Sequence, residues 1–90
     1  MRSFNIHSSP VIADGIVVTP LRLEDNSTGL FAHFKAAFAD IDECECLAFG
    51  ALGIDMIDTL NESDHISVEG VLYRDSNNRK SFYIFEIEKN

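Results

Sequence analysis

The sequence has few of the residues that most often reveal chemistry or a cellular compartment. It contains no tryptophan, two cysteines, two prolines and 7 Lys or Arg among 90 residues. Cys44 and Cys46 are one residue apart, so they would share one face of a strand, too close in sequence to staple a fold. A C-x-C pair supplies too few ligands for structural zinc, and His33 and His65 stand at no recognised metal spacing from it. We therefore predict buried free thiols, no metal site and no cofactor.

Long hydrophobic runs are also absent. No segment approaches the roughly 18 apolar residues that span a bilayer. The first residues, MRSFNIHSSPVIADG, lack a continuous apolar core of signal-peptide length. We therefore expect a cytoplasmic protein that does not associate with a membrane.

Positive charge is scarce relative to negative charge. The 15 Asp and Glu residues outnumber the Lys and Arg residues and give a formal net charge of -8. A chain of this charge repels nucleic acids and anionic membranes unless its few cations are clustered. No Ser-His-Asp array, carboxylate pair or Gly-rich phosphate loop stands at a spacing that would converge in a small barrel. We therefore predict that the protein is not an enzyme.

Composition and length predict one small β-rich domain. Hydrophobic residues make up 46% of the chain, and most of them stand in short runs rather than in long helical stripes. The first ten residues are closed by Ser8, Ser9 and Pro10 and form the loosest part of the sequence. We predict a flexible N-terminal segment over residues 1–10 and a folded domain over residues 11–90.

The first half of the domain reads as strands. Residues 11–18 are rich in β-branched side chains and predict a first strand, bent at Gly15. Residues 23–29 contain Asp, Asn, Ser and Gly, and we predict that they form the turn to a second strand over 30–38. Because side chains of a strand alternate between its faces, the second strand should have a core set and an open set. The core set is Leu30, Ala32, Phe34, Ala36 and Phe38, and the open set is Phe31, His33, Lys35 and Ala37.

The second half adds a helix between strands. A third strand is predicted over about residues 44–49, with Cys44, Cys46 and Ala48 in the core and Glu43, Glu45, Leu47 and Phe49 outside. In residues 51–60 the apolar Leu52, Met56 and Leu60 recur every four residues, which predicts a short helix. A fourth strand follows over 66–73 with a bulge or sharp coil at Gly70, then a polar hairpin tip over 75–80 and a last strand over 81–88. This order predicts an all-β, five-stranded OB-fold barrel with a short α-helix between strands three and four, a fold that often binds oligonucleotides or oligosaccharides.

Five segments carry a family resemblance. They are GIVVTPLRLEDNSTG, FAHFKAAF, LAFG directly before the helix, DHISVEGVLYR and YIFEIEKN. In order and spacing they resemble the bacterial single-stranded DNA-binding protein family (SSB), and the first segment is similar to the primosomal replication protein PriB. The resemblance covers roughly residues 11–90. It implies an OB-fold that forms a homodimer or tetramer and binds single-stranded DNA without base specificity, in DNA replication, repair or recombination.

The resemblance also identifies one stacking residue and two departures. Phe49 stands where the family keeps a stacking phenylalanine at the end of the third strand. The family usually has a stacking tryptophan six residues earlier and a basic residue four residues earlier, where this chain has Glu43 and Glu45. Each exposed carboxylate would disfavour a phosphate backbone by about 1 kcal/mol or less.

The residues themselves suggest a small aromatic and basic patch that could bind single-stranded nucleic acid. An alternative for Phe31 and Tyr73 is a subunit interface, and exposed charges at a hairpin can be simply solvated. Of Phe82, Tyr83 and Phe85, at least one should be exposed or lie between subunits, because one strand cannot direct all three inward. The candidate nucleic-acid-binding residues are Phe49, Lys35, His33, Phe31, Tyr73, Arg22, Arg74, Arg79 and Lys80.

Two functions remain open at this stage. The first is a single-stranded DNA-binding protein that stacks bases on an OB-fold face. The second is an acidic OB-fold interaction module, an adaptor or DNA mimic, that has lost nucleic-acid binding and docks a basic protein partner.

Overall fold

The structure is a computed structural model that describes residues 10–27, 29–39, 41–74, 77 and 79–90. The predicted flexible segment 1–10 lies outside this range except for Pro10. No helix within the described residues is long and apolar enough to cross a membrane. In chain order, the elements are β1 (Val11–Val17), β2 (Arg22–Asn26), β3 (Gly29–Phe38), β4 (Asp42–Phe49), α1 (Gly50–Thr59), β5 (His65–Arg74) and β6 (Lys80–Lys89).

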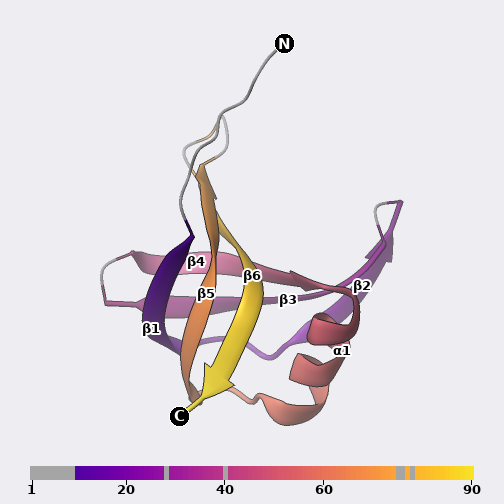
Figure 1. Cartoon of the computed structure of the whole chain (residues 1–90), viewed down its shortest axis with the longest axis horizontal. Helices are drawn as coiled ribbons and strands as arrows, with labels where there is room; N and C mark the ends of the chain where they lie inside the picture. Colours follow the sequence, from indigo (N-terminus) through magenta and orange to yellow (C-terminus); the bar gives the residue numbers. More distant parts are fainter. Residues whose placement is uncertain (1–9, 28, 40, 75–76, 78) are drawn as a thin grey trace.

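The strands form a closed barrel. Their order in the sheet is β1-β5-β6-β4-β3-β2, and an additional pairing between β1 and β3 closes the ring. The β4–β6 pairing is parallel and the others are antiparallel. Figure 1 shows β1, β5 and β6 side by side, crossing β3 and β4, with α1 beside β6. The predicted five-stranded OB-fold barrel, with its helix between the third and fourth barrel strands, is confirmed.

The barrel closes at Gly15. This residue pairs with Ile66 of β5 on one side and with Phe38 of β3 on the other. A Cβ atom at Gly15 would lie 2.5 Å from both the carbonyl oxygen of Ala37 and the ring of Phe38. The predicted bend at Gly15 is thus a point of close backbone approach, where a side chain has no room.

The core follows the alternation predicted for the second and third strands. Phe34, Ala36 and Phe38 on β3 are buried, as are the side chains of Cys44, Cys46 and Ala48 on β4. Both cysteines are free thiols, as predicted. The Cys46 Sγ lies 3.8 Å from the carbonyl oxygen of Cys44, and its hydrogen bond with the Cys44 thiol and its burial raise the pKa of Cys46. These thiols are packing groups of the core.

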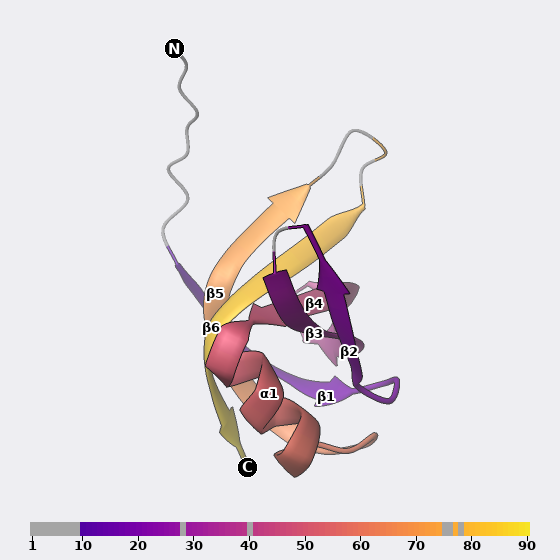
Figure 2. The same ribbon diagram turned by 90° about the vertical axis from the view of Figure 1, so that its right-hand side faces the viewer.

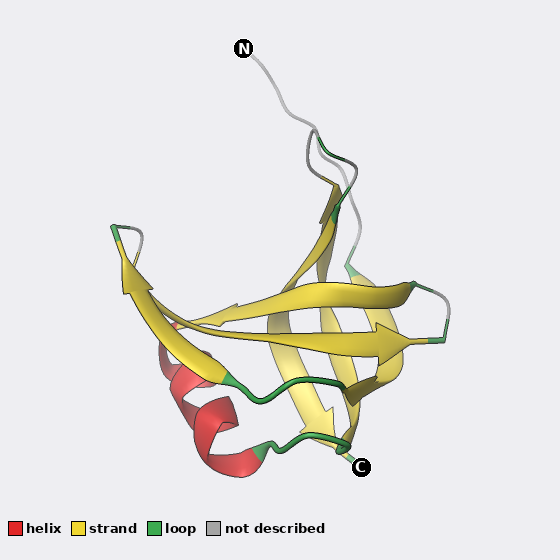
Figure 3. Cartoon of the chain, turned by 180° about the vertical axis from the view of Figure 1, so that it is seen from behind, coloured by secondary structure: helices red, strands yellow, loops and turns green. Residues whose placement is uncertain are grey.

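The second strand of the structure corrects one prediction. Residues 23–29 were predicted to be a connecting turn, but Arg22–Asn26 forms β2 and pairs with β3 from Arg22 opposite His33 to Asn26 opposite Gly29. All five residues of β2 are exposed, so the segment has no apolar alternation that would identify a strand. Its stability comes from backbone pairing with β3, and Figure 3 shows the two strands side by side from behind.

The helix closes one end of the barrel. It spans Gly50–Thr59, one residue earlier at each end than predicted, and buries Gly53 and Met56. A Cβ atom at Gly53 would collide with the backbone carbonyl of Ala48 and would lie 2.9 Å from the backbone nitrogen of Ala32. Backbone of the helix therefore rests directly on backbone of β3 and β4 (Figure 2).

Asp64 ties the end of the helix to the barrel. Its Oδ2 accepts a 2.8 Å hydrogen bond from the backbone nitrogen of Asn61 and lies 3.3 Å from the Nζ of Lys89. Its carbonyl oxygen accepts a 3.0 Å bond from the backbone nitrogen of Val17, and Lys89 also donates to the carbonyl of Thr59. The bond from Asn61, together with Lys89, holds the pKa of Asp64 below its usual value.

We predict that Gly53→Ala destabilises the fold by about 1–3 kcal/mol, because the added methyl group must displace backbone of β4. Helix propensity alone would give the opposite sign, since alanine is favoured over glycine within a helix by about 1 kcal/mol. Urea denaturation measures the change, with Ala51→Gly at an exposed helical position as the control for propensity. A more stable Gly53→Ala protein would contradict the close packing of α1.

We predict that Asp64→Ala lowers the free energy of unfolding at pH 7 and that the loss shrinks in acid. A carboxyl whose folded-state pKa is depressed contributes stability above its unfolded-state pKa, and this contribution disappears as the pH falls through the folded-state value. Thermal unfolding of both proteins at pH 7 and below pH 4 tests this, with exposed Asp58→Ala as the control. An equal stability gap at both pH values would show that Asp64 acts by packing alone.

Candidate nucleic-acid interface

Four aromatic rings form a continuous row across the outer face of the barrel. Ring centroids lie 5.1 Å apart for Phe31 and Phe49, 6.0 Å for Phe49 and Tyr83, and 4.8 Å for Tyr83 and Tyr73. The residues come from β3, β4, β6 and β5, which are neighbours in the barrel. Three of the rings are substantially exposed, at 39% for Phe49, 40% for Tyr83 and 51% for Tyr73. We call these four residues the aromatic ladder.

Phe31 has a different role from the one predicted. It lies on the outer side of β3, as its parity requires, but it is only 7% exposed rather than open. Phe49 stands directly opposite it on β4 and packs against its ring, and Glu24 stands opposite it on β2. The sequence analysis did not predict β2, and it therefore did not predict that β2 lies beside Phe31 and helps to bury it. The exposed ring of Phe49 therefore packs on the buried ring of Phe31.

Tyr83 joins the ladder, although the candidate list did not include it. The expectation that Phe82, Tyr83 and Phe85 cannot all point inward is confirmed, because Phe82 is buried and the other two are exposed. Tyr83 stands opposite Leu47 of β4 and Val71 of β5, which brings its ring between Phe49 and Tyr73. The alternation of side chains over residues 81–88 could place Tyr83 on the outer face. Only the register between β6 and β4 identifies the rings beside it.

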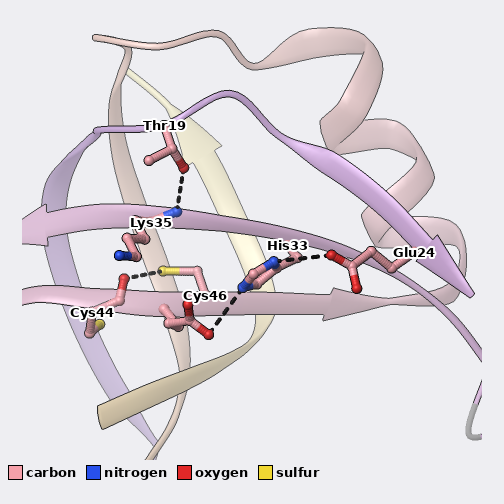
Figure 4. Close-up of polar contacts among 7 residues, drawn as sticks. Thr19, Glu24, His33, Lys35, Cys44 and Cys46 are labelled. Atoms are coloured by element: carbon pink, nitrogen blue, oxygen red, sulfur yellow. Dashed lines mark hydrogen bonds and ion pairs between the residues drawn. The ribbon is translucent and has the colours of Figure 1, made fainter. Parts of the chain in front are cut away.

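Two acidic side chains next to the ladder share a histidine. The Nδ1 of His33 lies 3.4 Å from Oε2 of Glu24, and its Nε2 lies 3.0 Å from Oε1 of Glu45. Figure 4 shows the ring of His33 on β3 pointing toward Glu24 on β2. The imidazole of His33 thus lies between the two carboxylates, and Glu45 is not an isolated side chain on this face.

Three of the predicted residues lie together on one pocket of this face. Arg22, His33 and Lys35 line one small pocket together with Thr19 and Pro20. The backbone nitrogen of Lys35 donates a 2.9 Å hydrogen bond to Oγ1 of Thr19. On its other side, Lys35 stands opposite Glu45 of β4. The structure thus brings these three candidate residues together at one pocket.

The hairpin cations meet acidic residues. Arg79 and Lys80 line one cleft with Lys35, and the same cleft contains Asp42, Glu43 and Glu45. The Nζ of Lys80 donates a 3.3 Å bond to the carbonyl oxygen of Ile41. Arg74 is exposed at the end of β5, next to Tyr73 of the ladder. Part of the predicted hairpin tip, residues 75, 76 and 78, lies outside the described residues.

The face offers no metal centre in the part of the chain that the structure describes. No group of three His, Cys, Asp or Glu side chains converges there as metal ligands would. Its chemistry consists of flat aromatic surfaces, a few cations and partly neutralised carboxylates, an arrangement suited to non-covalent binding of stacked rings.

Comparison with known proteins identifies the fold. No family model and no curated protein sequence matches the chain. Among solved structures, the small single-stranded DNA-binding protein from Streptomyces coelicolor superposes with a TM-score of 0.85 at 17% identity, over 96% of each chain. The chain has an SSB-like OB-fold. The resemblance seen in the sequence segments is thus confirmed for the fold.

Two further structures extend this likeness. The second single-stranded DNA-binding protein, SSBb, of Mycobacterium smegmatis gives a TM-score of 0.81 at 15% identity and covers 93% of this chain and 90% of its own. The protein PriB of Ralstonia solanacearum gives 0.71 at 14% identity, over 90% of this chain and 96% of its own. Both relatives named in the sequence resemblance therefore share the SSB-like fold.

Proposed function

We propose that this chain binds single-stranded DNA without sequence specificity along the aromatic ladder. The observation that carries the proposal is the continuous row of rings from Phe31 to Tyr73, three of which are exposed on one face. Bases of any sequence stack on aromatic side chains, because every base has a π-face. Arg22, Lys35 and Arg74 flank the row and are the cations available to the phosphates. The names of the structural neighbours support the same function.

The energetic balance favours stacking over repulsion. Base stacking on an aromatic residue contributes about 1–3 kcal/mol per base, and Phe49, Tyr83 and Tyr73 each offer an accessible ring. An exposed carboxylate costs about 1 kcal/mol or less, and His33 lies between two of them, Glu24 and Glu45. Because few cations are present, few counterions are released, and we expect a shallow dependence of affinity on salt.

The proposal also includes a cellular process, a location and an oligomeric state. We propose a cytoplasmic protein that acts in DNA replication, repair or recombination as a homodimer or tetramer. Exposed apolar side chains on several strands, including Ile16 and Leu23, supply surface that subunit contacts could bury. The predicted basic protein partner belongs to the second candidate function.

A second candidate function rests on the acidic end of β4. Asp42, Glu43 and Glu45 lie on or beside one cleft, in a chain of net charge -8. A barrel that presents carboxylates there could act as an adaptor or DNA mimic for a basic surface. No binding of oligo(dT) at low salt and tens of micromolar protein would favour this function and remove the first.

We predict that Phe49→Ala weakens oligo(dT) binding by about 5- to 150-fold, the equivalent of losing one stacked base. Fluorescence anisotropy with labelled oligo(dT) at low and moderate salt gives the affinities. Phe85→Ala is the matched control, because Phe85 is an exposed phenylalanine outside the ladder. Equal losses of affinity in both variants would show that oligo(dT) binding does not depend on the ladder.

We predict that His33→Ala weakens oligo(dT) binding by up to about fivefold, because Glu24 and Glu45 lose the imidazole that contacts them both. The same anisotropy titration gives the affinities. Adding Glu24→Gln and Glu45→Gln to the His33→Ala protein should restore binding. No rescue by these substitutions would show that His33 acts through the shape of the face instead.

A further inference from the structure

A second groove lies on the outer face of the barrel away from most of the ladder. It crosses β1, β5 and the C-terminal half of β6, which run side by side in Figure 1, and it extends to Leu52 of α1. Its apolar side chains include Ile12, which is 73% exposed, and Phe85, which is 49% exposed. The groove measures about 480 Å³ and lies on a face for which the DNA-binding proposal has no use.

The charged side chains that line this groove are all acidic. Glu69 of β5 stands directly opposite Glu86 of β6, and Ser67 stands opposite Glu88. Ile12 is the other neighbour of Glu69, on β1. No Lys or Arg lines the groove among the described residues. Like charges directly across a strand pair are destabilising, so the fold tolerates an unfavourable pair beside exposed apolar groups.

One edge of the groove also offers unpaired backbone. β4 pairs with β6 only over Ser81–Tyr83, although β6 continues to Lys89. Beyond Tyr83, no strand in the described part of the chain pairs with the outer edge of β6. The register shift between Glu69 and Gly70 leaves Phe85 without a paired residue on β5. An open edge beside apolar side chains is a surface to which an extended peptide can add.

We propose that this groove binds an extended, basic and partly apolar segment of a protein partner. The backbone of the segment pairs with the outer edge of β6, its apolar side chains contact Phe85, and its Lys or Arg side chains pair with Glu86 and Glu88 and reach across β6 to Glu69. Charge complementarity decides among the possible occupants. A second copy of the same face would place glutamates against glutamates, and nucleic acid would add phosphates to them. The inference is independent of DNA binding by the ladder.

The test uses a short fluorescent peptide that alternates lysine with valine, titrated by anisotropy into the full chain at moderate salt. A peptide that alternates lysine with serine measures the part of the affinity that comes from charge alone. We expect the lysine–valine peptide to bind more tightly, and Phe85→Ala to weaken that peptide but not the lysine–serine peptide. Amide shifts in an NMR titration should lie on residues 84–88 and on the facing part of β5.

Two double variants with the same charge change supply the decisive comparison. Glu69→Gln with Glu86→Gln should weaken the lysine–valine peptide about tenfold, and it should raise the Tm, because it removes the like-charge pair. Asp42→Asn with Glu43→Gln, near the other cleft, should leave the affinity unchanged. Equal losses in the two double variants would overturn the proposal and show non-specific attraction to an acidic protein.

Two further outcomes would also overturn it in favour of another occupant. Tighter peptide binding after deletion of residues 1–9 would assign the groove to the chain's own N-terminal segment. Self-association that Glu69→Gln with Glu86→Gln or Phe85→Ala abolishes in sedimentation would assign it to a second copy.

Discussion

Closure of the barrel at Gly15 is the constraint on which the rest of the structure depends. At this residue β1 pairs with β5 and β3 at once, in a space that a Cβ atom would fill. A closed ring fixes the register of every strand, and register decides which side chains meet on each face. Phe31 faces Phe49, and Leu47 faces Tyr83, because of this register. The aromatic ladder is thus a consequence of closure combined with the two-residue period of four strands.

On the face that carries the aromatic ladder, rings available for stacking lie near negatively charged side chains. In an SSB-like fold with many cations, phosphate contacts would provide most of the affinity, and salt would reduce it steeply. Here the flanking cations are few and some share a cleft with acids, as Lys35 and Lys80 do with Glu43 and Glu45. The attraction left for nucleic acid is therefore the stacking itself, which salt screens little. His33 matters in this balance because it lies between the carboxylates of Glu24 and Glu45.

The sequence predicted the parts of the fold that depend on local pattern. Alternation placed Cys44 and Cys46 in the core and Phe49 outside, and the four-residue spacing of Leu52 and Met56 located the helix to within one residue. It did not predict β2, whose exposed residues read as a turn and are held by the backbone of β3. It also could not place Glu24 beside His33 or Tyr83 beside Phe49, because these contacts depend on register between distant strands. The candidate list therefore included Phe49 and Tyr73 of the ladder but neither Tyr83 nor Glu24.

The aromatic ladder and the acidic groove are connected through β6. The nature of this connection limits how strongly binding at one site can change the affinity of the other. Tyr83 of the ladder and Phe85 of the acidic groove are two residues apart on the same strand. A basic segment bound to the groove would offset part of the net charge of -8 and so reduce the long-range repulsion of DNA. The screening length is about 8 Å at physiological salt, so a charge bound in the groove is felt at Tyr83 but hardly at Phe31, at the far end of the ladder. Electrostatic coupling across the molecule should therefore be weak at physiological salt and grow as salt is lowered. Coupling that persisted at high salt would have to pass through the backbone of β6, where the outer-edge pairing proposed for Phe85 begins immediately after the β4 pairing that holds Tyr83 in the ladder.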